Sequence, residues 1–171
     1  LLAEGATLYG VNTGFGKLAN QRIPPQEVLA LQENLLRSHA VGMGPLLGIP
    51  VSRLALALRI QALAKGYSGV TVALVDTLLE MYNRGVVPAV PEQGSVGASG
   101  DLAPLAHMAL VVMGEGQAFV TRPGPSGNGP AGGRPPGKRP LSGRAALRQA
   151  HLQPHRPLAK EGLSLINGTQ V

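Results

Sequence analysis

Cysteine is absent from the 171 residues of this chain. Its absence excludes disulfides, a thiolate nucleophile and a cysteine-ligated metal, and it is typical of a reducing compartment such as the cytoplasm. No apolar run approaches the about 20 residues that cross a bilayer. The first residues also show no basic segment followed by an apolar one, as a secretory leader would. We therefore expect a cytoplasmic protein with no membrane contact.

Acidic residues are missing from residues 121–157, which hold seven of the chain's 15 Lys and Arg. The other eight basic residues face nine acidic ones, so the excess positive charge belongs to this one segment. A basic segment is suited to nucleic acid in principle. This one contains no Phe, Tyr or Trp to stack on bases, so a nucleic-acid-binding piece is the weakest interpretation. We expect no nucleic-acid partner.

Apolar residues are nearly missing from residues 121–143, where Gly, Pro and Arg dominate. Such a segment buries too little surface to offset the entropy of ordering it. We expect it to be irregular, exposed and dispensable for stability. Either a genuine insertion or translation in a shifted reading frame explains this composition.

Apolar residues recur at helical spacing through most of the remaining chain, which predicts a mainly α-helical protein. Four helices are expected, over residues 24–40, 53–65, 72–84 and 101–113. Ser52, Thr71 and Asp101 are the expected N-caps of the last three. Residues 1–23 and 86–100 contain glycine and proline without periodicity, and we expect them to be loops.

The most informative stretch is residues 97–105, with the letters GASGDLAPL. Ala98, Ser99 and Gly100 have the composition for an intramolecular condensation. The unhindered Gly100 amide nitrogen attacks the Ala98 carbonyl with loss of water, and the Ser99 hydroxyl leaves as a second water. The product is a methylidene electrophile made from the chain itself. A plain tight turn of small residues is the alternative. A Gly-x-Ser-x-Gly nucleophile elbow does not fit, because Asp101 stands where the last Gly belongs.

Three further motifs accompany this triplet in the order of the chain. They are YGVNTGFG at residues 9–16, LQENLLRSHA at residues 31–40 and KEGLSLINGTQ at residues 160–170. Together the four motifs resemble those of the histidine ammonia-lyases, a group within the aromatic amino acid lyases. The resemblance covers residues 1–120 and 144–171, and four motifs in the family's order are highly specific.

The resemblance implies a fold and an architecture. The fold would be mainly α, as the N-terminal portion of the aspartase/fumarase-like helical lyase fold that contains the methylidene-imidazolone group, with the central helical bundle missing. Residues 1–120 would form the lyase N-terminal domain, residues 121–143 an irregular insert or frame-shifted segment, and residues 144–171 the start of the central helical region. The full-length family member would be a homotetramer.

The resemblance also implies a reaction, the elimination of ammonia from L-histidine to give trans-urocanate in histidine catabolism. No external cofactor is needed, because Ala98, Ser99 and Gly100 would form a 4-methylidene-imidazole-5-one. An aromatic amino acid aminomutase with the same electrophile is one alternative, and an inactive truncated remnant is another. The family's anchor for the substrate carboxylate lies beyond Val171. We therefore expect the chain alone not to deaminate histidine.

Site roles follow residue by residue from the matched motifs. Tyr9 matches the catalytic base, on a loop that closes over substrate. His39, in a Ser-His pair typical of the histidine enzymes, matches the residue that favours an imidazole substrate. Asn167 matches an active-site Asn that hydrogen-bonds near the electrophile. Without the resemblance, these residues are typical of a half-buried Tyr, a helix C-terminal His and a turn-forming Asn.

The other histidines indicate no metal site. His107 lies on an apolar stretch and is expected to pack there with a hydrogen bond. His151 and His155 are four residues apart, but Pro154 disrupts the helix that would align them.

Overall fold

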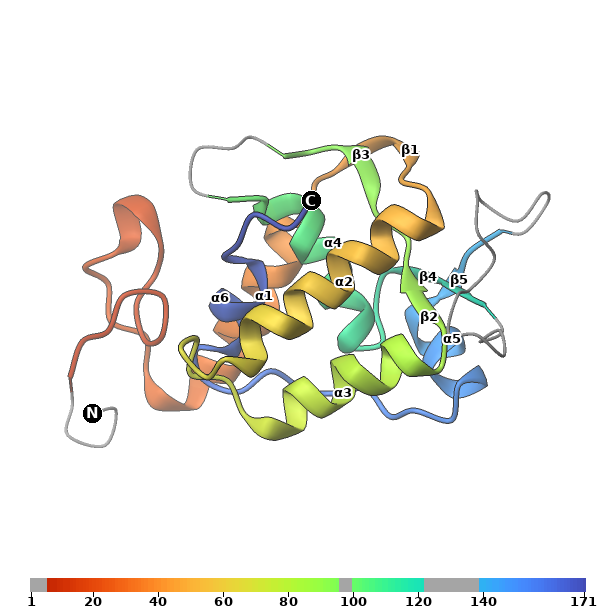
Figure 1. Ribbon diagram of the computed structural model, residues 1–171. Coiled ribbons are helices and arrows are strands. Elements are labelled where there is room, and N and C mark those ends of the chain that lie inside the picture. Colours follow the sequence, from red (N-terminus) through yellow and green to blue (C-terminus); the bar gives the residue numbers. More distant parts are fainter. Residues whose placement is uncertain (1–5, 96–99, 122–138) are drawn as a thin grey trace.

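The computed structural model describes residues 6–95, 100–121 and 139–171 (Figure 1). The helices are η1 (Gly16–Leu18), η2 (Pro25–Glu27), α1 (Val28–His39), α2 (Ile49–Ala64), α3 (Val72–Asn83), α4 (Leu102–Val112), α5 (Gly143–Gln149) and α6 (Glu161–Ile166). The strands are β1 (Met43–Leu46), β2 (Val86–Pro88), β3 (Pro91–Gln93), β4 (Gln117–Val120) and β5 (Leu141–Ser142). The mainly helical fold predicted from the sequence is confirmed.

Helix α4 lies at the centre of the hydrophobic core. It contains no charged residue, and most of its side chains are buried on every side, as expected of a helix surrounded by protein. Helices α1, α5 and α6 pack against it. Leu36 of α1, Leu147 of α5 and Ile166 of α6 are almost fully buried in the same cluster. Because α4 begins directly after the Ala98–Gly100 triplet, the core fixes the direction in which the chain leaves the triplet.

Helices α2 and α3 pack against each other across the front of the molecule in Figure 1. The Thr71 hydroxyl accepts a hydrogen bond from the Leu74 amide, so the predicted N-cap of α3 is confirmed. The helix predicted at residues 53–65 is present as α2, but its predicted start was wrong: the helix begins at Ile49, with Pro50 in its first turn. Ser52 is therefore an interior residue, buried and without a hydrogen-bond partner for its hydroxyl in the described part of the chain.

Two strands occupy part of the predicted loop at residues 86–100, so that prediction was wrong in part. β2 and β4 are antiparallel, and β5 adds to the other edge of β4. β3 pairs with β1 in a separate two-stranded sheet. Val86, Val87 and Val90 are all buried, so the segment has no alternation of apolar and polar residues to reveal it.

The described ends of residues 121–143 are more structured than the composition predicts. Thr121 is buried, and its amide and hydroxyl both donate to the Gly85 carbonyl. Leu141 pairs with Ala118, and Gly143 is so close to the backbone of Glu115 that no side chain fits there. At these ends the prediction is wrong for Thr121 and Gly143, which are buried, and for the strand β5; Leu141 and Ser142 are exposed, as predicted. Residues 122–138 lie outside the described part.

Candidate functional site

Three of the four sequence motifs meet through one buried side chain, Gln32 of α1. Its Nε2 donates to the Gly10 carbonyl at 3.1 Å, in the loop that carries Tyr9. Its Oε1 accepts from the Leu163 amide of α6 at 3.2 Å. Gln32 is fully buried, so both bonds are shielded from water. A Cβ on Gly162 would lie 2.7 Å from the Gln32 carbonyl, which explains why α6 carries a glycine where it crosses α1.

The fourth motif reaches α6 through the backbone. The Asp101 amide donates to the Gly168 carbonyl at 2.7 Å, which joins the start of α4 to the turn after α6. Gly100 has a φ of +126°, and a Cβ there would lie 2.5 Å from the Gly168 carbonyl oxygen. Only glycine suits this position. The end of the triplet is therefore packed directly against the residue that follows Asn167.

Tyr9 and His39 lie on either side of Phe15. The Tyr9 and Phe15 ring centroids are 5.6 Å apart and those of Phe15 and His39 are 6.4 Å apart, both in edge-to-face arrangements. Tyr9 is 58% exposed, so its phenol is accessible from solvent. The structure thus brings the predicted base and the predicted specificity residue to one aromatic cluster.

His39 has a hydrogen-bond pattern that assigns its tautomer. Its Nδ1 lies 2.9 Å from the Leu35 carbonyl oxygen and 3.1 Å from the Ser38 hydroxyl. A carbonyl oxygen only accepts, so Nδ1 carries the proton. In the neutral ring, Nε2 then holds a lone pair and can accept a hydrogen bond.

The remaining predicted site residues are placed as follows. Asn167 is exposed at the C-terminal end of α6, where its backbone amide donates to the Leu163 carbonyl. Ala98 and Ser99 lie outside the described residues. The predicted packing role of His107 is confirmed: its Nε2 accepts from the Gly42 amide at 3.0 Å, and burial lowers its pKa.

Asp101 does not cap α4 with its side chain, although it occupies the N-cap position. Its carboxylate instead accepts from the Ser95 hydroxyl and from the Val171 amide. The prediction of a side-chain cap was wrong, because the carboxylate accepts hydrogen bonds from two other segments instead of from the first turn of α4. Asp101 is 5% exposed, and its contacts hold the chain on both sides of the site.

Arg59 of α2 is a buried cation beside the same turn, and it is 4% exposed. Its guanidinium donates to the Ser164 carbonyl and, at 3.2 Å, to Gln170 Oε1. Burial lowers the pKa of Arg59 to about 10. The arginine nonetheless stays charged at neutral pH.

Glu161 is a buried carboxylate at the start of α6, and it gathers four donors. Two come from Thr71, one from the Leu158 amide, and one from His155 Nε2 at 2.9 Å. Burial alone would raise the pKa of Glu161, but the hydrogen bonds outweigh it and hold the pKa below its ordinary value. Glu161 thereby ties α6 to the N-terminus of α3.

Sequence reasoning missed three of these residues as members of the site: Gln32, Arg59 and Glu161. A signal was present for two of them. Gln32 interrupts the apolar stripe of α1, and Arg59 interrupts that of α2, and each is a buried polar residue with a long side chain. Nothing in the spacing indicated which partners they would find.

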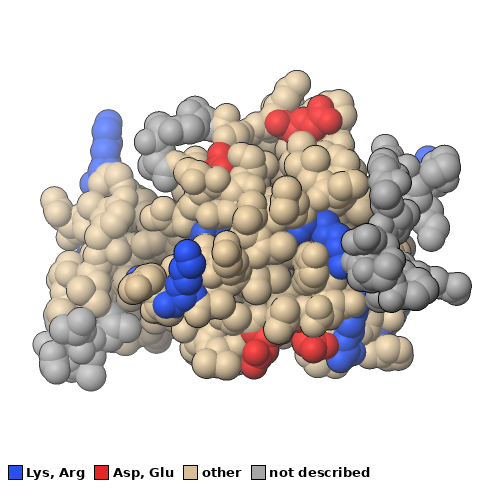
Figure 2. Space-filling model, viewed as in Figure 1, with Lys and Arg blue, Asp and Glu red and all other residues tan. Residues whose placement is uncertain are grey.

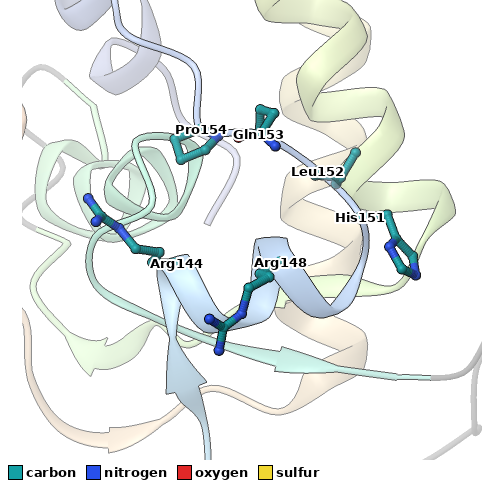
Figure 3. A pocket seen from close by; sticks show the side chains of 6 residues that line it. All are labelled: Arg144, Arg148, His151, Leu152, Gln153 and Pro154. Atoms are coloured by element: carbon teal, nitrogen blue, oxygen red, sulfur yellow. The ribbon is translucent and has the colours of Figure 1, made fainter.

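A cavity lies away from the motif residues, none of which lines it. It has a volume of about 560 Å³ and lies beside α5 (Figure 3). Arg144 and Arg148 line it together with His151, but the two guanidiniums project in different directions (Figure 3). All three residues are exposed, so the cavity presents no set of convergent polar groups.

Gly100 provides the test of whether the chain fits a methylidene-imidazolone group. Ring closure needs an unhindered amide nitrogen at the third residue of the triplet, and the structure admits only glycine there. The Asp101 amide and the Gly168 carbonyl hold the chain immediately after that nitrogen. The described residues therefore fit a group formed from Ala98, Ser99 and Gly100.

The helical fold described above is that of ammonia-lyases and aminomutases, as comparison with solved structures shows. The histidine ammonia-lyase of Trypanosoma cruzi matches 99% of the chain with a TM-score of 0.80 and 39% identity. A phenylalanine aminomutase of Pantoea agglomerans matches 99% with a TM-score of 0.82 and 34% identity. The chain covers 29% of each of those two proteins.

The family model described as aromatic amino acid lyase matches residues 1–171, and the chain belongs to that family. A histidine ammonia-lyase of Anaeromyxobacter is 53% identical over 169 residues, and one of Vibrio cholerae is 46% identical over 170. Both alignments include 99% of this chain. The chain spans 32% and 30% of the length of these two relatives.

Proposed function

We propose that this chain supplies part of the active site of a histidine ammonia-lyase, which converts L-histidine to trans-urocanate and ammonia. The observation that carries the proposal is the meeting of all four motifs around α6. Gln32 joins the Tyr9 loop to α6, and Asp101 joins the Ala98–Gly100 triplet to the turn after it. The identity to histidine ammonia-lyases, 46–53%, supports the substrate.

Ala98, Ser99 and Gly100 would form the methylidene-imidazolone, which supplies an electrophile that withdraws electrons from the substrate. The chain's own residues hold this segment in place. Gly100 precedes the N-terminus of α4, where the helix dipole favours negative charge. Asn167, exposed at the end of α6 and beside Gly168, would hydrogen-bond there.

Tyr9 would remove the β-proton of the substrate. Tyr9 is exposed on a loop whose backbone Gln32 holds at Gly10, so its side chain is accessible to a substrate. Loss of such a group typically costs ~10²–10⁴ in rate.

His39 would select an imidazole substrate. Because the Nδ1–H of His39 donates a hydrogen bond to the Leu35 carbonyl, its Nε2 is free to accept one. The imidazole N–H of L-histidine is a matching donor. A phenyl ring offers no such donor, which is the physical basis for discrimination at this position.

The surface supports a proposal about assembly. Val51, Leu54 and Leu58 form an exposed apolar row on α2, and Val72 is 75% exposed nearby on α3. Figure 2 shows mostly residues other than Lys, Arg, Asp and Glu over α2, with charged residues along the lower edge of α3. We propose that the whole protein is a homotetramer in the cytoplasm, in which such surface is covered. None of the described helices is both long and apolar enough to span a membrane.

A hybrid enzyme tests the proposed function. Residues 1–171 replace the matching part of the Anaeromyxobacter relative, and urocanate formation from L-histidine is followed by its ultraviolet absorbance. Turnover within about tenfold of the relative, abolished by Ser99→Ala, is the expected result. A folded hybrid without turnover would support the inactive remnant, and a β-amino acid product would support an aminomutase. Either outcome overturns the proposal.

A further inference from the structure

Arg59 is buried without a carboxylate to balance its charge among the described residues. Its two partners, the Ser164 carbonyl and the Gln170 side chain, are neutral, and its Nε has no partner there. A buried cation of this kind costs more free energy than a well-packed apolar side chain of the same size. Core stability alone therefore does not explain an arginine at this position of α2.

The two partners of Arg59 lie on either side of Asn167. Ser164 is in the last turn of α6, and Gln170 follows the turn that Asn167 and Gly168 make. Gly168 is so close to the Arg59 guanidinium that a side chain there would overlap it. From α2, Arg59 thus donates hydrogen bonds to residues on both sides of the turn, Ser164 before it and Gln170 after it.

Asp101 holds the same segment through hydrogen bonds of its own. Its amide donates to the Gly168 carbonyl at 2.7 Å, and its carboxylate accepts from the Val171 amide at 3.0 Å. The segment 164–171 is therefore held by both a buried cation on α2 and the buried carboxylate that precedes α4. If the hydrogen bonds of either Arg59 or Asp101 are lost, Gly168 no longer has a fixed position against Gly100.

We propose that Arg59 is a positioning residue of the active site, which fixes the Asn167 turn against the end of the Ala98–Gly100 triplet. The guanidinium is suited to this because its planar fork reaches two acceptors at once. The inference rests on the proposed function only in naming the triplet and Asn167 as active-site groups. The hydrogen bonds that Arg59 makes to this segment are present in the chain whether or not it catalyses a reaction.

Amide hydrogen exchange of the 171-residue chain tests the proposal with three variants. In Arg59→Met, we expect the Asp101 amide to exchange about tenfold faster, because its acceptor at Gly168 is no longer held. The amides of Leu105 and Met108 in α4 should keep their rates. Arg59→Lys, which keeps the charge but not the fork, should give an intermediate rate. Arg53→Met removes a half-buried arginine of the same helix that stacks on Tyr82, and it should leave the Asp101 rate unchanged.

Two results overturn the proposal. One is an unchanged Asp101 rate in Arg59→Met, and the other is an equal acceleration at Asp101, Leu105 and Met108, which indicates general destabilisation. If Arg59→Met does not fold, Arg59→Lys decides by the same comparison. The intact mass of each variant is read in parallel, and the fraction that has lost two waters should fall in Arg59→Met. A wild-type chain that loses no water contradicts the proposed function but leaves the exchange comparison valid.

Discussion

Single residues at the contacts of α6 carry more of the site than their chemistry alone suggests. Gly100, Gly162 and Gly168 each occupy a position where a Cβ would overlap a neighbouring segment. Gln32 makes two buried hydrogen bonds to two different motifs. The motifs of this chain therefore contain residues that bring segments together as well as residues proposed to react.

Replacing Gly162 with alanine tests this at one position. The new Cβ would lie 2.7 Å from the Gln32 carbonyl, and neither backbone can yield cheaply. We expect Gly162→Ala to lose ~1–3 kcal/mol of unfolding free energy, measured by urea denaturation. The matched control is Gly48→Ala, whose Cβ would have 3.7 Å to its nearest neighbour and an ordinary φ of −59°. A control that loses as much as Gly162→Ala would contradict the packing argument.

Tyr9→Phe in the hybrid enzyme separates the phenol from the ring. The ring contact with Phe15 is retained, so folding and water loss should be unchanged. Turnover should fall by ~10²–10⁴, the usual worth of a general base. Tyr67→Phe, at a position that is 90% exposed, is the control and should be neutral. A Tyr9→Phe enzyme within a few-fold of its parent would remove Tyr9 from the proposed role.

At the scale of elements, α6 is short yet central, and its stability depends on a buried charge. Glu161 has a lowered pKa, so the folded state binds its proton more weakly than the unfolded state does. Its contribution to stability is complete above pH 4.5, the ordinary value for this group, and is lost as the pH falls through the lowered one.

The acid dependence of Glu161→Gln checks this sign. The variant should be less stable than the wild type at pH 7, and the difference should shrink as the pH falls below 4.5. Thermal melts between pH 7 and pH 3 measure both. Glu27→Gln, at an exposed position, should show no such convergence. A difference that stays constant or grows on acidification would contradict the account.

The basic segment offers a second test at this scale. Replacing residues 122–138 with a short Gly-Ser linker should leave the melting temperature unchanged, because their composition provides no apolar face. Removing residues 121–143 should lower it, because Thr121, β5 and Gly143 are then lost. Equal melting temperatures in both variants would show that the described ends of this segment do not contribute to the stability of the fold.

Helices were predictable from the sequence where a cap and an apolar period coincide. Thr71 followed by the apolar period of α3 is the clear case. Ser52 shows the limit, since a serine suited to capping lies inside α2 and Pro50 marks the true start. β2 and β5 were not predicted, because each is stabilised by pairing with β4, which is distant in the sequence.

For the molecule as a whole, the motif order predicted the family, and the core explains why the motifs meet. α4 begins beside the triplet, α1 carries Gln32 and His39, and α6 lies against both helices. The bonds of Gln32 to Leu163, of Arg59 to Gln170 and of Glu161 to Thr71 were not predictable, because each joins residues far apart in the sequence. The chain spans 32% of its Anaeromyxobacter relative, so the reaction of the whole protein remains our proposal.

The intact mass of the purified 171-residue chain tests the central claim most directly. If Ala98, Ser99 and Gly100 condense as proposed, the wild-type chain is lighter than its sequence by two water molecules. The loss should map to the tryptic peptide that begins at Gly85. Ser99→Ala has no hydroxyl to lose and cannot reach that mass. A wild-type chain with the full mass of its sequence would contradict the claim that this segment makes its own electrophile.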